Sequence, residues 1–138
     1  MNNKQVLILD CNGQARPAIC FNLEVAGFTT RIVTDEDEAI NLLSNSRLTG
    51  ECFSELVINN PYLNVDIAGV LEAIEKVGID IPVVFVKESQ SLRQYVQSLQ
   101  SEYRQLRIFY VEPTGTVDLI MTFRASESDF TTNRWVAP

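Results

Sequence analysis

The chain has 138 residues, of which 46% are hydrophobic and 21% are charged, a composition typical of one globular domain and not of a disordered or fibrous protein. Its 18 acidic and 11 basic residues give a net charge of -7, which opposes direct binding to nucleic acid. No apolar run approaches the roughly 20 residues that cross a bilayer, and no signal segment is recognised. We therefore expect a cytoplasmic protein without membrane contact.

The side chains that carry most enzyme chemistry are scarce. The sequence contains no histidine, and Cys11, Cys20 and Cys52 have no C-x-x-C spacing. This composition argues against a zinc site and against hydrolases that use a Ser-His or Cys-His pair. We predict reduced thiols, no cofactor, no metal and no enzymatic activity.

The first half of the chain alternates between strand and helix patterns. The apolar run at residues 6–9 ends at Asp10 and predicts a strand that is buried on both faces. Helical spacing over residues 15–26 and a β-branched strand over residues 29–33 follow. The four acidic residues 35–38 are typical of a helix start, where they complement the helix dipole, rather than of a metal site.

The second half repeats this alternation. The polar stretch 44–51 predicts a loop. Further strands are predicted at residues 56–58, 81–86 and 108–111, and further helices at residues 67–77, 89–105 and 117–125. Five successive strand-helix units predict a parallel sheet with helices on both faces.

Ligands of such sheets bind outside the carboxyl ends of the strands, so the residues found there are the candidates for function. They are Asp10, Cys11, Asn59, Asn60, Lys87 and Glu112.

Over residues 4–125 the chain resembles the receiver domain of two-component response regulators. Residues 6–10 are similar to its acidic-ended first strand, residues 81–87 to its I-P-V strand, and residues 109–113 to its aromatic strand, which normally ends in Lys-Pro. The resemblance implies a doubly wound five-stranded parallel sheet of the flavodoxin-like (CheY-like) kind, a three-layer α/β/α sandwich. Residues 126–138 would then form a C-terminal arm or a linker to an effector domain.

The resemblance also implies a set of chemical positions, and this chain departs from the family at several of them. An acidic pair that holds Mg²⁺ in the family corresponds to Asp10 and Cys11, so one carboxylate is replaced by a thiol. The phosphoryl-accepting aspartate corresponds to Asn60, or to Asn59 if the next loop is one residue longer. A carboxamide cannot accept a phosphoryl group as a carboxylate does.

Two further positions are also changed. Lys87 stands where the family has Thr or Ser, and Glu112 stands where it has Lys. We hypothesise that these two side chains form an ion pair; the alternative is that both point into solvent. Phe109 stands at the position of the aromatic residue that swings inward on activation, although an aromatic there could also be simple core filling.

These departures predict an atypical pseudo-receiver in signal transduction, which is not phosphorylated at the usual position. We expect it to act by protein-protein interaction or homodimerisation through its helix-four/strand-five/helix-five face, and to control an attached or partner effector such as a transcription regulator. The alternatives are a receiver-like sensor of a small ligand such as a nucleotide second messenger and, less favoured, an enzyme on the same fold.

Overall fold

A single five-stranded parallel sheet forms the centre of the molecule. The computed structural model describes residues 5–10, 18–59, 61, 66–87 and 89–133, and among these the side chains of Arg47 and of residues 125–133 are not described. The strand order is β2-β1-β3-β4-β5, which confirms the predicted flavodoxin-like sheet. The strands are β1 (Gln5–Asp10), β2 (Thr30–Val33), β3 (Phe53–Asn59), β4 (Val83–Val86) and β5 (Ile108–Val111).

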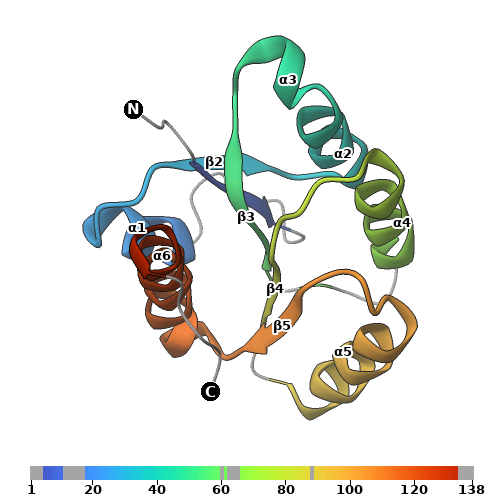
Figure 1. Cartoon of the computed structure of the whole chain (residues 1–138). Coiled ribbons are helices and arrows are strands. Elements are labelled where there is room, and N and C mark those ends of the chain that lie inside the picture. The colour runs from blue at the N-terminus through green and yellow to red at the C-terminus, as the bar shows by residue number, and fades with distance from the viewer. Residues whose placement is uncertain (1–4, 11–17, 60, 62–65, 88, 134–138) are drawn as a thin grey trace.

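Helices cover both faces of the sheet, as Figure 1 shows. They are α1 (Ala18–Val25), α2 (Glu36–Ser44), α3 (Ser46–Thr49), α4 (Ile67–Val77), α5 (Gln90–Glu102) and α6 (Thr116–Asn133), with a 3-10 turn η1 (Pro113–Gly115) before α6. Helices α1 and α6 pack on one face, and α2, α4 and α5 pack on the other. None of the described helices is long and apolar enough to span a membrane.

Two apolar cores lie between these layers. Because side chains alternate along a strand, Leu7 and Leu9 of β1 face α2, α4 and α5, whereas Val6 and Ile8 face α1 and α6. The same alternation in β3 and β4 buries both faces of the central strands. The continuous apolar runs of the sequence are therefore what a parallel sheet with two covered faces requires.

Strand β3 is longer than the predicted segment 56–58. The prediction was too short because Glu55, a charged residue, interrupts the apolar pattern in the first half of the strand. This charged residue is only 2% exposed, and Arg124 of α6 pairs with it. The pairing of β1 with β3 shifts register here, since Gln5 is opposite Phe53 whereas Val6 is opposite Glu55. The shift lets Phe53 pack on the α2/α4/α5 side while Glu55 turns towards α6.

The polar stretch 44–51 contains the one-turn helix α3, so the prediction of a loop throughout was wrong. One turn is too short to produce a periodic pattern. It ends at Gly50, whose φ of 77° lies in the left-handed region that favours glycine. The predicted helix start at residues 35–38 is confirmed, because the side chain of Asp35 caps α2 by accepting from the Glu38 amide at 2.8 Å.

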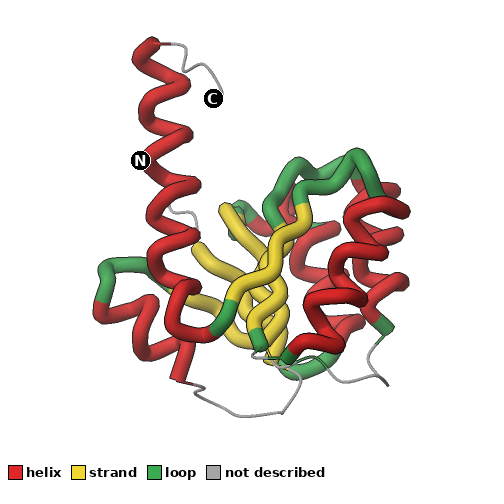
Figure 2. The backbone as a smooth tube through the Cα atoms, turned by 90° about the horizontal axis from the view of Figure 1, so that it is seen from below, coloured by secondary structure: helices red, strands yellow, loops and turns green. Residues whose placement is uncertain are grey.

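The last helix is longer than predicted. Helix α6 runs from Thr116 to Asn133 without interruption, and Figure 2 shows it projecting beyond the sheet. The predicted division between a domain at 1–125 and an arm at 126–138 stays a prediction, but the residues on the two sides of that boundary belong to one helix.

Candidate functional site

The carboxyl edge of the sheet collects the candidate residues that the structure describes. Asp10 ends β1 and Asn59 ends β3, and these two residues are direct partners in the register of the two strands. Lys87 follows β4, and Glu112 follows β5. Cys11 and Asn60 lie outside the described residues, so their predicted roles stay predictions.

Asp10 and Asn59 form the buried centre of this edge. Asp10 is fully buried, and Asn59 is 6% exposed. The Asn59 amide nitrogen donates to Asp10 Oδ1 at 3.0 Å. A buried carboxylate requires donors, and an amide supplies one without adding a second negative charge beside the first. Asn59 is one of the two alternative positions for the family's acceptor, and the choice between it and Asn60 stays open because Asn60 lies outside the described residues.

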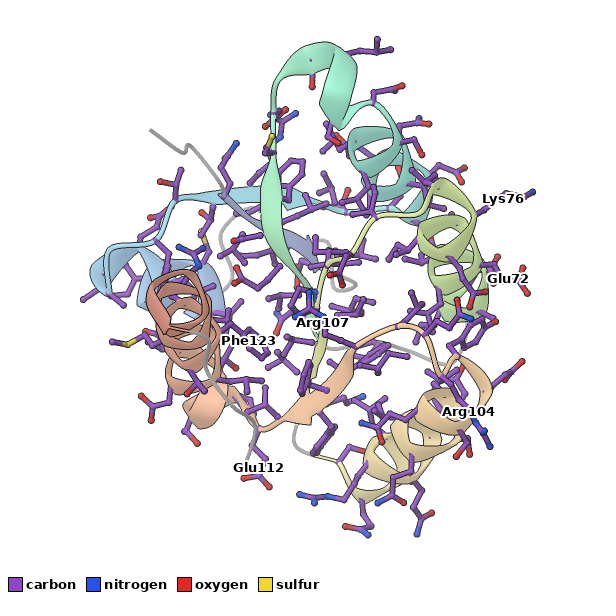
Figure 3. The ribbon with its side chains drawn as sticks, viewed as in Figure 1. Glu72, Lys76, Arg104, Arg107, Glu112 and Phe123 are labelled. Atoms are coloured by element: carbon purple, nitrogen blue, oxygen red, sulfur yellow. The ribbon has the colours of Figure 1, made fainter. Side chains whose placement is uncertain are left out.

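Lys87 and Glu112 do not form the ion pair that was hypothesised. Lys87 is half-buried, and its ammonium donates to the Pro61 carbonyl at 3.4 Å. Glu112 is exposed, and Figure 3 shows its side chain pointing away from the body of the molecule. Glu112 is the N-cap of η1, and its carbonyl accepts from the Gly115 amide, so its backbone belongs to the turn that leads from β5 into α6.

Phe109 and Tyr110 occupy opposite faces of β5. Phe109, the predicted switch aromatic, faces α6, where its ring centroid lies 4.9 Å from that of Phe123. Figure 3 shows Phe123 between α6 and the sheet. The switch role of Phe109 stays a prediction, and its described contact is the packing of a core residue.

Tyr110 is the aromatic residue that contacts the loop between β4 and α5, and sequence reasoning missed it. Its hydroxyl lies within hydrogen-bonding distance of the Lys87 and Ser89 carbonyls and accepts from the Ser89 amide at 3.1 Å. The Arg93 guanidinium stacks 4.9 Å from the centre of its ring. The signal was available, since two adjacent aromatic residues on a strand face opposite sides of the sheet, but only Phe109 was considered, on its family resemblance.

The described residues of this edge do not fit the Mg²⁺ that the family's chemistry uses. Asp10 is the one carboxylate that this edge buries within the described part of the chain, and an amide already bonds to one of its oxygens. No group of three Cys, Asp or Glu side chains among the described residues is close enough together to hold a metal ion. A hard divalent cation needs several oxygen ligands, and the described residues of this edge do not supply them.

The predicted partner-binding face includes helix α5, whose buried and exposed sides the structure describes. Helix α5 buries Leu92, Val96 and Leu99 and exposes a polar face with Tyr95, which is 41% exposed. Its C-cap residue, Tyr103, is buried and places its hydroxyl 3.5 Å from a carboxylate oxygen of Glu72 in α4. Burial, and then the Glu72 charge, raise the pKa of Tyr103 above its ordinary value.

Comparison with known proteins is informative at the level of structure. No family model and no curated protein matches the sequence. Among solved structures, the Francisella response regulator 1452 receiver domain is 20% identical with a TM-score of 0.60, and the match covers 86% of this chain and 91% of that one. FixJ-N is 18% identical with a TM-score of 0.64 and full coverage of both chains.

The chain has the receiver-domain fold. A third match agrees: the E. coli RcsC C-terminus, which contains a linker region and a phosphoreceiver domain, is 16% identical with a TM-score of 0.68, over 96% of this chain and 50% of that fragment. Within this receiver fold, the one-turn α3 shifts the helix count, so that helix four of the family is α5 here and helix five is α6.

Proposed function

We propose that this chain is a pseudo-receiver: a signalling domain that keeps the receiver fold but neither accepts a phosphoryl group nor turns over a substrate. The observation that carries the proposal is the hydrogen bond between Asn59 and the buried Asp10. An acceptor carboxylate at this position would lie beside a second carboxylate and would need a cation to offset the repulsion. An amide removes both the nucleophile and the need for that cation.

The domain then acts without a phosphorylation signal through its surface. Tyr110 supports this proposal, because it ties β5 to the β4-α5 loop and, through Arg93, to α5. In this arrangement the β4-α5 loop is held by contacts internal to the chain rather than by a phosphoryl group. We propose that the resulting α5/β5/α6 face binds a protein partner or a second copy of this chain, and so controls an attached or partner effector such as a transcription regulator.

A titration followed by NMR tests the absence of phosphoryl chemistry. The ¹⁵N-labelled chain is mixed with Mg²⁺ and beryllofluoride, a mimic of the phosphorylated aspartate, with the RcsC phosphoreceiver domain as a positive control. We expect no shift of the amide signals of Asp10, Asn59 and Lys87. A saturable shift of these signals would contradict the proposal. A separate titration with nucleotides addresses the alternative of ligand sensing, which a saturable response would favour.

Sedimentation velocity tests the proposed face. We expect a concentration-dependent dimer that is weakened by Tyr95→Ala on the exposed side of α5. Lys76→Ala is the matched control, because Lys76 is exposed on α4, outside the α5/β5/α6 face. A chain that stays monomeric at all concentrations would refute self-association, and an equal effect of the two substitutions would refute the location of the face.

A further inference from the structure

Helix α6 joins the two edges of the sheet and continues beyond one of them. It begins beside the carboxyl edge, where Thr116 is fully buried and its hydroxyl donates to the Glu112 carbonyl at 3.4 Å. It then runs along the sheet to Arg124 at the amino edge, and residues 125–133 extend the helix by roughly 13 Å. Figure 2 shows this end of α6 projecting past the strands.

A polar cluster holds α6 at the point where it leaves the sheet. The Glu55 carboxylate accepts from Arg124 Nε at 3.3 Å and from Arg124 Nη2 at 3.2 Å. Arg124 Nη2 also donates to Ser54 Oγ at 2.7 Å. The guanidinium lies 4.8 Å from the ring centre of Phe28, which precedes β2. We call the group formed by Phe28, Ser54, Glu55 and Arg124 the clasp.

The clasp differs in kind from the other contacts of α6. The remaining described contacts with the sheet are apolar, and they include buried Ile120 and the Phe109–Phe123 ring pair. Hydrophobic burial is non-directional, so apolar contacts define the direction of a helix less sharply than a hydrogen-bonded ion pair does. A two-point guanidinium-carboxylate pair is directional, and Glu55 is held rigidly because it is 2% exposed within β3.

We propose that the clasp is a conformational device that fixes the direction in which α6 leaves the domain. With the clasp closed, residues 125–133 continue in a single orientation. With the clasp open, α6 keeps its apolar contacts near β5, while its far end is free to take other directions. Because α6 is one continuous helix, a displacement of its first turn at the carboxyl edge would strain the Arg124–Glu55 contacts of the clasp. This inference does not depend on the proposed function.

The test separates orientation from stability. In the double variant Glu55→Leu/Arg124→Met both charges are removed, and replacing a buried ion pair by apolar residues leaves stability close to the original. Residual dipolar couplings then report the direction of α6 relative to β1 and β3. We expect that the couplings of residues 125–133 no longer fit one orientation. We also expect amide exchange in the second half of α6 to rise about tenfold or more, with exchange in β1 and β3 unchanged.

Two matched variants complete the experiment. Glu55→Gln keeps an acceptor for Arg124 and should retain the orientation of α6. Arg31→Met removes the exposed Arg31–Glu51 pair, which joins β2 to the segment before β3, and should leave α6 unaffected. An unchanged α6 in the double variant would overturn the inference, because apolar packing alone would then set the direction. A parallel rise of exchange in α6, β1 and β3 would also overturn it, because the clasp would then be a stabilising contact only.

Discussion

The two edges of one sheet bury carboxylates in different ways. At the amino edge, Glu55 meets a guanidinium, so charge is balanced by charge. At the carboxyl edge, Asp10 meets the neutral amide of Asn59. The fold therefore places a buried carboxylate at each end of its central strands, and the contacts described above differ: Glu55 accepts from a guanidinium, and Asp10 accepts from an amide. The guanidinium contact fixes α6 at the amino edge, whereas the amide at the carboxyl edge is the contact on which the proposed loss of phosphoryl chemistry rests.

The largest effect is expected at the amino edge. Arg124→Met leaves Glu55 buried without its cation, and breaking such a pair should lower the free energy of unfolding by about 3 kcal/mol. This is the lower end of the usual range, because the Arg124 side chain is 33% exposed. Urea denaturation measures the change. A decrease in the free energy of unfolding of less than about 1 kcal/mol would mean that the Arg124–Glu55 pair contributes no more than a surface ion pair, and the two edges would then not differ in this respect.

At the carboxyl edge the effect should be smaller. Asn59→Ala removes one donor from the buried Asp10 carboxylate, which should cost about 2 kcal/mol, as expected when a buried polar group loses a hydrogen bond. Asn22→Ala on the exposed side of α1 is the control, since a surface substitution should change stability by less than about 0.5 kcal/mol. Equal stability of the Asn59→Ala variant and the unchanged chain would mean that the amide does not support Asp10.

Tyr110 should contribute less than Asn59. Tyr110→Phe keeps the ring that Arg93 stacks on and removes the hydroxyl, so that the Ser89 amide loses an acceptor and stability should fall by about 1 kcal/mol. The NMR signals of Ser89 and Lys87 should shift, because both residues contact that hydroxyl. Phe109→Leu is the contrasting variant: it should perturb Phe123 and leave Ser89 unchanged.

The smallest effect concerns alkaline pH. Because the pKa of Tyr103 is raised in the folded chain, the unfolded chain loses this proton first as the pH rises. Stability from this group is therefore complete below about pH 10, the ordinary pKa of tyrosine, and declines as the pH passes through the raised value. Melting curves of Tyr103→Phe should show a shallower decline above pH 10 than those of the unchanged chain. Parallel curves would contradict the role of Tyr103.

Sequence reasoning reached the fold because two covered faces require continuous apolar strands, such as residues 6–9 and 81–86. It failed where a local pattern depends on a residue far away in the sequence. The start of β3 was missed because Glu55 is charged, and its partner Arg124, which permits its burial, lies 69 positions later. At the candidate site, Asp10 and Asn59 were identified from strand ends, but the predicted Lys87–Glu112 pair is absent because Glu112 is exposed and points away from the body of the molecule.

The central claim is that this receiver fold does not accept a phosphoryl group. The most direct measurement is intact-mass spectrometry after incubation with acetyl phosphate and Mg²⁺, on the unchanged chain and on the single variants Asn59→Asp and Asn60→Asp. The account predicts no phosphoryl adduct on any of the three, because the acidic pair and the Thr/Ser and Lys positions of the family are also changed. An acid-stable, stoichiometric adduct on the unchanged chain, or an aspartyl-phosphate on either variant, would contradict it.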